Sequence, residues 1–141
     1  MAAGVLIDTG PLVALIDRGD ERHTDCVAAL REVRPPLLTT WPVVTEAMHL
    51  LHRAGWPAKR LLWELVTSDE FELADMDAAA TARARALMEK YRDLPMDLGD
   101  ATLVALAERR RVRQVLTLDG HFRVYRTATR AGFEVLPTPI S

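Results

Sequence analysis

The sequence has one cysteine, few aromatic residues and no long apolar run, and each shortage excludes a class of protein. Cys26 has no second cysteine in the chain, so an intramolecular disulfide is excluded, which fits a reducing compartment. No apolar stretch approaches the roughly 20 residues that a membrane-spanning helix needs. The short apolar run near the N-terminus follows no basic segment, which argues against a signal peptide. We therefore expect a cytoplasmic protein with no membrane partner.

The chain also lacks an excess of positive charge. Its 18 Lys and Arg against 20 Asp and Glu give a formal net charge of -2. Overall charge therefore does not attract nucleic acid, and local patches or a bound metal would have to do so. Hydrophobic residues make up 49% of the 141 residues, which is enough for one core and argues against disorder. We expect a single domain over residues 1–141.

Short apolar segments alternate with helical patterns along the chain. Strands are expected at residues 5–7, 37–39, 71–73, 114–118 and 133–136. Helices are expected from Pro11, with Gly10 as cap, to near Gly19, from Asp20 and Glu21 to Pro35, from Pro42 to Arg53, from Pro57 onward, from Asp77 to Tyr91 and from Leu98 to Arg110. The "DGHF" segment is expected as a turn, and a Pro-containing tail follows Leu136. This order predicts an α/β fold, a parallel sheet with helices on both sides.

Several acidic residues border apolar sequence at the ends of these elements. They are Asp8 after the first strand, Glu46 at the edge of a helix's apolar stripe, Asp97 and Asp100 at the start of a very apolar helix, and Asp119 after "QVLTL". In open parallel sheets ligands bind beyond the carboxyl ends of the strands, where Asp8 and Asp119 are expected. Converging carboxylates repel one another unless a cation lies between them, and oxygen ligands without His or Cys favour Mg²⁺ or Mn²⁺.

Most of these acids also have a structural explanation. Asp97 and Asp100 are spaced like a capping box at a helix start. Asp119 precedes Gly120 and could be an ordinary turn residue, and Glu46 could lie on a solvated helix flank. Asp8 is the hardest to explain structurally, because Gly10 is expected to cap the following helix.

Four segments, "VLIDTGPLVALID", "WPVVTEAMHLL", "DLPMDLGDATLVALAERR" and "QVLTLDGHF", together resemble the PIN-domain ribonucleases. The resemblance is to the VapC-like group, the toxins of type II toxin–antitoxin pairs. The Asp-Ala pair at residues 100–101 and the Thr-x-Asp at residues 117–119 are its more specific marks. The resemblance implies a PIN-like three-layer fold, a central parallel sheet of about five short strands flanked by helices.

The resemblance also implies a site and a reaction. It implies that Mg²⁺ or Mn²⁺ binds to four acids, which are Asp8, Glu46, Asp100 and Asp119. These acids would catalyse the hydrolysis of RNA, which leaves a 5′-phosphate and a 3′-hydroxyl. Asp97 matches a position that is acidic in only part of the family and is a further candidate ligand. Thr9 and Thr117 are expected to contact the ligands rather than the metal. A cognate antitoxin and a homodimer are the partners that the resemblance implies.

Basic and aromatic residues suggest further contacts. His121, Arg123 and Arg126 are candidates for RNA binding, although a solvated face and a turn explain them as well. The arginines of "ERRRVR" could simply be favourable charge at a helix C-terminus. Tryptophans 41, 56 and 63 are expected in the core or an interface rather than as platforms for stacked bases. The hairpin of helices around Gly55 is a region that contributes to the antitoxin groove in the family.

Parts of the sequence also match other functions. "IDTG" resembles the active-site loop of retroviral-type aspartic proteases, but that fold is nearly all β and this chain is mostly helical. A haloacid dehalogenase-type phosphatase needs a second Asp at position 10, which is Gly10. A PIN-like RNA- or protein-binding module with little catalysis, and a PIN nuclease of RNA processing without an antitoxin, remain open alternatives.

Overall fold

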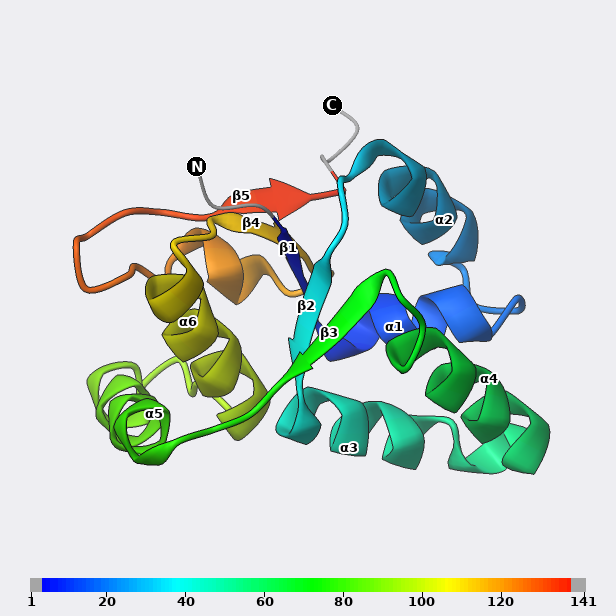
Figure 1. Ribbon diagram of the computed structural model, residues 1–141, viewed down its shortest axis with the longest axis horizontal. Coiled ribbons are helices and arrows are strands. Elements are labelled where there is room, and N and C mark those ends of the chain that lie inside the picture. Colours follow the sequence, from blue (N-terminus) through cyan, green and yellow to red (C-terminus); the bar gives the residue numbers. More distant parts are fainter. Residues whose placement is uncertain (1–3, 138–141) are drawn as a thin grey trace.

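The protein is described by a computed structural model over residues 4–137. Five strands form one parallel sheet in the order β3-β2-β1-β4-β5 (Figure 1). The strands are β1 (Val5–Ile7), β2 (Leu37–Thr40), β3 (Phe71–Ala74), β4 (Gln114–Leu116) and β5 (Glu134–Leu136). Every adjacent pair is parallel, with Leu6 opposite both Leu38 and Val115. The predicted parallel sheet of five short strands is confirmed. From residue 138 onward the expected tail lies outside the described residues.

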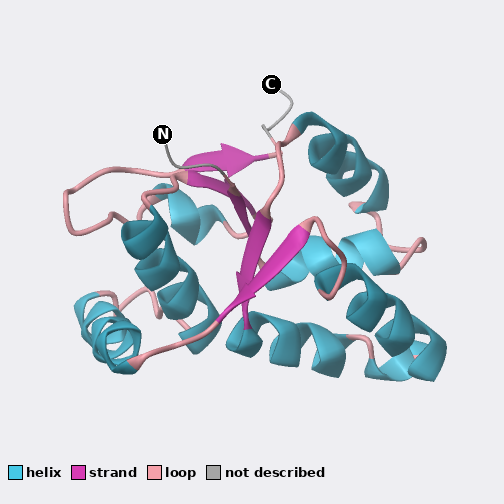
Figure 2. Ribbon diagram, in the orientation of Figure 1, coloured by secondary structure: helices cyan, strands magenta, loops and turns pink. Residues whose placement is uncertain are grey.

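Helices cover both sides of this sheet, which makes three layers. They are α1 (Thr9–Ile16), α2 (His23–Glu32), α3 (Trp41–Leu50), α4 (Trp56–Val66), α5 (Ala78–Lys90) and α6 (Leu98–Arg110), with short 3-10 helices η1 (His52–Ala54) and η2 (Gly120–Arg123). Figure 2 shows α1, α2 and α4 on one side and the α5–α6 pair on the other, with α3 between them below the sheet. The connection between two parallel strands is almost always right-handed. Because β2 and β3 lie on one side of β1, and β4 and β5 on the other, the connecting helices cover opposite faces of the sheet.

The centre of the molecule is apolar from the sheet outward. β1 and β2 are buried along their full length, as expected for strands covered on both faces. Helix α6 is buried from Gly99 to Ala107, as its apolar sequence requires, so other elements cover it on all sides. Its first turn, which carries Asp100, is therefore buried, and α6 packs against α5, α3 and β2.

The chain changes direction at β1. From β1 it adds β2 and β3 on one side, and later it returns to add β4 and β5 on the other side. The carboxyl ends of β1 and β4 therefore mark the topological switch point, where α/β folds bind ligands. Asp8 directly follows β1, and Thr117 and Asp119 closely follow β4.

Several predicted boundaries were wrong, for local reasons. Helix α1 begins at Thr9, so Asp8 rather than Gly10 is its N-cap, with an extended backbone and Oδ1 accepting a hydrogen bond from the Thr9 N–H. Helix α2 begins at His23 because residues 20–22 form a turn in which the Arg22 N–H donates to the Asp20 side chain. Strand β4 ends two residues early, and "DGHF" opens the 3-10 helix η2 rather than forming a simple turn.

Candidate metal centre

Asp8 occupies the junction between β1 and α1, and its carboxylate is held on both oxygens. Oδ1 accepts from the Thr9 N–H at 2.8 Å, and Oδ2 accepts from the Thr117 hydroxyl at 2.8 Å. The residue is only 7% exposed. A buried strand thus ends on a carboxylate whose direction is fixed by a helix N-terminus and by the neighbouring strand.

Asp100 comes from the first turn of α6. Asp97 is the N-cap of this helix, and its Oδ1 accepts from the Asp100 N–H at 2.7 Å. The capping explanation of Asp97 is therefore confirmed. Asp100 itself is buried, and its Oδ2 accepts a hydrogen bond from the Tyr125 hydroxyl at 2.9 Å. Negative charge is favourable at a helix N-terminus, which is one reason why these acids are accommodated there.

Asp119 lies just beyond β4 and is linked to Asp8 through one threonine. The Asp119 N–H donates to the Thr117 hydroxyl at 3.0 Å, and that hydroxyl donates in turn to Asp8. The Asp119 carboxylate accepts from the His121 N–H at 2.9 Å, so Asp119 also begins η2 as its N-cap. The turn explanation is therefore correct for its backbone, and it leaves the carboxylate at the end of the sheet.

The structure brings these three acids together. Asp8, Asp100 and Asp119 each offer a carboxylate oxygen, and these oxygens lie within 4.8 Å of one another. Burial raises the pKa of Asp8 to about 6, against the lowering effect of its hydrogen bonds to Thr9 and Thr117. Burial raises the pKa of Asp100 to about 8, helped by the negative charges of Asp8 and Asp97. The site strongly disfavours three negative charges on their own.

The donor set fits a divalent cation of the hard type. Such ions take oxygen ligands at roughly 2.0–2.6 Å, so carboxylate oxygens separated by no more than 4.8 Å can share one. A cation would offset the repulsion that raises both pKa values, and the site offers oxygen atoms rather than sulfur or ring nitrogen. These residues therefore fit a metal of the Mg²⁺ or Mn²⁺ type.

Glu46 lies beside this group without belonging to it. Its Oε2 is 3.5 Å from the Thr9 hydroxyl, which also donates to the Val43 carbonyl at 3.3 Å. Gly99, next to Asp100, leaves space there: a Cβ on Gly99 would lie 3.9 Å from the same Glu46 oxygen and 3.4 Å from Asp97 Oδ1. Glu46 and Asp97 are exposed acids at the edge of the buried group.

The candidate RNA-binding residues have different surroundings. The ring Nδ1 of His121 lies 3.4 Å from Asp119 Oδ1, so this histidine is next to the acidic group. Arg123 is exposed. Arg126 folds back on its own segment, where Nη1 donates to three carbonyl oxygens, including that of Arg123 at 2.8 Å. Its guanidinium thus already has a structural role.

Sequence reasoning missed Tyr125. The segment "HFRVYR" was interpreted through its arginines, yet Phe122 and Tyr125 are both fully buried and Tyr125 contacts a candidate ligand. Their spacing of three residues is the signal that could have shown one apolar face.

The tryptophans are not in the core, contrary to one of the two expectations. Trp41 and Trp63 lie with ring centroids 6.2 Å apart, edge to face, and both are exposed. Helices α3 and α4 together expose the large apolar side chains of Trp41, Leu50, Trp56, Leu61 and Trp63, a set that we call the α3–α4 apolar surface. On α4, Leu62 and Val66 are buried, whereas Leu61 is exposed. Exposed apolar groups of this size mark contact surfaces.

Among residues 4–137, no helix is long and apolar enough to cross a membrane.

The fold and the acidic group define an α/β protein with a carboxylate site at the sheet's switch point. The chain belongs to the PIN domain family, whose model matches residues 5–128. Ribonuclease VapC26 of Mycobacterium tuberculosis is 31% identical over 135 residues, which are 94% of this chain and 100% of that protein. The resemblance to the VapC-like group is thus confirmed.

Solved structures share the fold at lower identity. VapC20 of Mycobacterium tuberculosis, described as a sarcin-ricin loop cleaving toxin, matches with a TM-score of 0.77 and 22% identity over 82% of this chain and 90% of its own. A toxin–antitoxin complex from Klebsiella pneumoniae matches at 0.65 and 20% identity, over 82% and 86%. VapBC2 of Rickettsia felis, bound to a promoter DNA fragment, matches at 0.62 and 12% identity, over 94% and 98%.

Proposed function

We propose that this protein is a divalent-metal-dependent endoribonuclease and the toxin of a toxin–antitoxin pair. The observation that supports this most is the buried group of Asp8, Asp100 and Asp119, whose oxygens lie within 4.8 Å of one another. The relative named as a ribonuclease covers almost the whole chain. We further propose that residues 1–141 form one PIN domain and that it acts in the cytoplasm.

The three buried carboxylates would hold Mg²⁺ or Mn²⁺. When bound, such a cation lowers the pKa of a water and offsets negative charge on the scissile phosphate. Glu46, whose Oε2 is near the Thr9 hydroxyl, would add a ligand or would orient the attacking water. Asp97 is a further candidate ligand through Oδ2, because its Oδ1 caps α6. Two threonines orient these acids by hydrogen bonds: the Thr9 hydroxyl donates to Glu46, and the Thr117 hydroxyl donates to Asp8.

Basic side chains would hold the RNA backbone beside this group. The ring of His121 lies next to Asp119, and within residues 4–137 the side chain of Arg123 makes no hydrogen bond or ion pair. Arg126 would contribute the guanidinium N–H groups other than those of Nη1, which already donates to backbone carbonyls. Because the formal net charge is -2, the cation and these few residues would supply the attraction for an acidic polymer.

The α3–α4 apolar surface would bind the antitoxin. Trp56 is 62% exposed and Leu50 is 55% exposed, and large apolar groups that remain in water are stabilised when a partner covers them. An apolar segment of the antitoxin is the occupant that we propose. We also propose that the toxin forms a homodimer, which sedimentation of the purified protein measures directly.

The test of the activity is cleavage of total RNA by purified protein that has been freed of any partner. Cleavage is expected with Mg²⁺ or Mn²⁺ and is expected to stop with EDTA. Asp100→Asn should lower the rate by about a thousandfold or more, since removing a metal ligand removes several kcal/mol of transition-state stabilisation. Asp69→Asn, an exposed acid before β3, is the matched control and should retain full activity. No cleavage by folded wild-type protein would contradict the proposal and favour a binding module.

A further inference from the structure

Tyr125 is a fully buried tyrosine whose hydroxyl meets a single carboxylate. It donates to Asp100 Oδ2 at 2.9 Å, and its ring is 0% exposed. The rings of Tyr91 and Phe122 pack edge-on against it, each with a centroid distance of 5.1 Å. Aromatic packing on two sides leaves the ring little freedom, so the hydroxyl is aimed at Asp100 rather than merely near it.

The acids of the candidate metal centre differ in the source of their hydrogen bonds. Asp8 is held by Thr9, the next residue, and by Thr117 at the end of the neighbouring strand. Asp119 is held by the N–H of His121, two residues away. Within residues 4–137, Tyr125 is the one protein group that donates to the Asp100 carboxylate, and it comes from 25 residues later in the chain.

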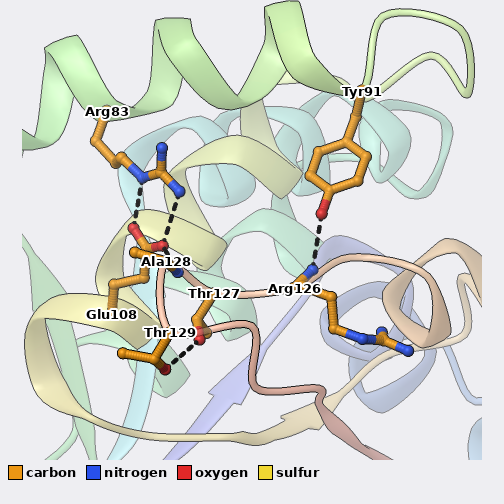
Figure 3. A network of polar contacts seen from close by, with 7 residues as sticks. All are labelled: Arg83, Tyr91, Glu108, Arg126, Thr127, Ala128 and Thr129. Carbon is orange, nitrogen blue, oxygen red and sulfur yellow. Dashed lines mark hydrogen bonds and ion pairs between the residues drawn. The ribbon is translucent and has the colours of Figure 1, made fainter.

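The segment after Tyr125 is clamped to α5 and α6, as Figure 3 shows. The Arg126 N–H donates to the Tyr91 hydroxyl at 2.9 Å, next to the end of α5. The Ala128 N–H donates to Glu108 Oε2 at 2.5 Å, near the end of α6. Glu108 is itself held by Arg83 through two hydrogen bonds, of 2.7 and 2.9 Å. These contacts fix the backbone that carries Tyr125.

We propose that Tyr125 is a positioning residue of the metal centre: its hydroxyl holds Oδ2 of Asp100, so that the carboxylate presents its other oxygen to the cation. The inference rests on the proposed function for the presence of the cation. An aspartate carboxylate turns about its terminal bond, which has broad minima, so an unanchored Asp100 would spend less time with one oxygen directed at its neighbours. Partners of this kind are typically worth ten- to a hundredfold in metal affinity.

The first test measures Mn²⁺ binding by calorimetry, without RNA, in wild type, Tyr125→Phe and Thr67→Val. Tyr125→Phe keeps the buried ring and should weaken Mn²⁺ binding by about tenfold. Thr67→Val removes a hydroxyl that donates to the Trp63 carbonyl at the end of α4 and contacts neither Asp100 nor the segment that carries Tyr125, so it should leave the affinity unchanged. Equal affinity in wild type and Tyr125→Phe, or an equal loss in both variants, would overturn the inference.

The second test needs no substitution at position 125. The chain has two tyrosines, so tyrosine labelled with ¹³C at the ring carbon that bears the hydroxyl gives two resonances, which Tyr91→Phe assigns. Adding Mg²⁺ should shift the Tyr125 resonance, because the carboxylate that it holds gains a cation, and Asp100→Asn should abolish the shift. A Tyr125 resonance that stays in place while calorimetry records Mg²⁺ binding would overturn the inference.

Activity separates this inference from the proposed function. Wild-type cleavage with a Tyr125→Phe rate that is about tenfold lower at limiting Mn²⁺, and largely regained at saturating Mn²⁺, supports both. Wild-type cleavage with an unchanged Tyr125→Phe rate at limiting metal contradicts the inference alone. Wild-type protein that binds Mn²⁺ through Tyr125-held Asp100 but cleaves no RNA contradicts the proposed function alone.

Discussion

The two ends of helix α6 carry charged residues in opposite settings. At its N-terminal end Asp100 is buried beside Asp8, and within the described residues no Lys or Arg pairs with either acid. At its C-terminal end Glu108 is paired with Arg83, and Arg110 with Glu72. The charges at the C-terminal end are therefore neutralised by side chains of the protein itself, whereas the two carboxyl groups at the N-terminal end, when ionised, have no such partner. Unbalanced buried charge lowers stability, and proteins retain it where a ligand has to be bound.

The largest expected effect is a pH-dependent instability of the acidic end without metal. The pKa values of Asp8 and Asp100 are raised to about 6 and about 8. A raised pKa means that the folded state binds the proton more tightly than the unfolded state does. The resulting contribution to the free energy of unfolding is complete below the ordinary aspartate pKa of about 4, and it is lost as the pH rises through the two folded-state pKa values. In EDTA, the metal-free protein should become less stable between pH 5 and pH 8.

Asp100→Asn removes the larger part of this instability. In EDTA at pH 8 it should raise the free energy of unfolding by on the order of 3 kcal/mol, and at pH 5 by much less. Thermal unfolding at both pH values measures the difference. The same change at both pH values would show that Asp100 is not protonated in the folded state as described.

The paired end should respond in the opposite direction and by less. Glu108→Ala leaves Arg83 and the Ala128 N–H without their acceptor, so it should lower the free energy of unfolding by about 2 kcal/mol. Glu72→Ala removes the acceptor of Arg110 in a more exposed pair and should cost less than about 0.5 kcal/mol. Urea unfolding compares the two variants, and equal costs would contradict the distinction.

The smallest expected effect is at Arg109. Its Nη1 lies 3.8 Å from the Asp77 carboxylate, and both side chains are more than half exposed. Arg109→Ala should change the free energy of unfolding by less than about 0.5 kcal/mol, because solvent screens such pairs. A loss of 1 kcal/mol or more in urea unfolding would show that the basic run "ERRRVR" has a structural role beyond favourable helix-end charge.

Much of the fold and part of the site could be predicted from residues alone. Apolar runs between helical patterns predicted all five strands, and Asp8 and Asp119 were placed at the sheet's edge because parallel strands end there together. The boundaries failed where a side chain competes for a backbone group, as at Asp8, whose carboxylate caps α1. The sequence pattern predicted Gly10 as the N-cap, because proline is favoured at the first position of a helix. In the structure Pro11 is instead the third residue of α1, still within its first turn.

Tertiary contacts decided what local patterns leave open. Tyr125 and Asp100 are 25 residues apart, and only the packing of α6 against the chain after β4 brings the hydroxyl to the carboxylate. Packing also left Trp56 exposed, and it separated Glu46 from the three acids that converge. The sequence by itself determined the elements and the kind of chemistry, because strand, helix and cap preferences depend on near neighbours. Which side chains meet depended on the order of strands in the sheet, because residues far apart in the chain share no local signal.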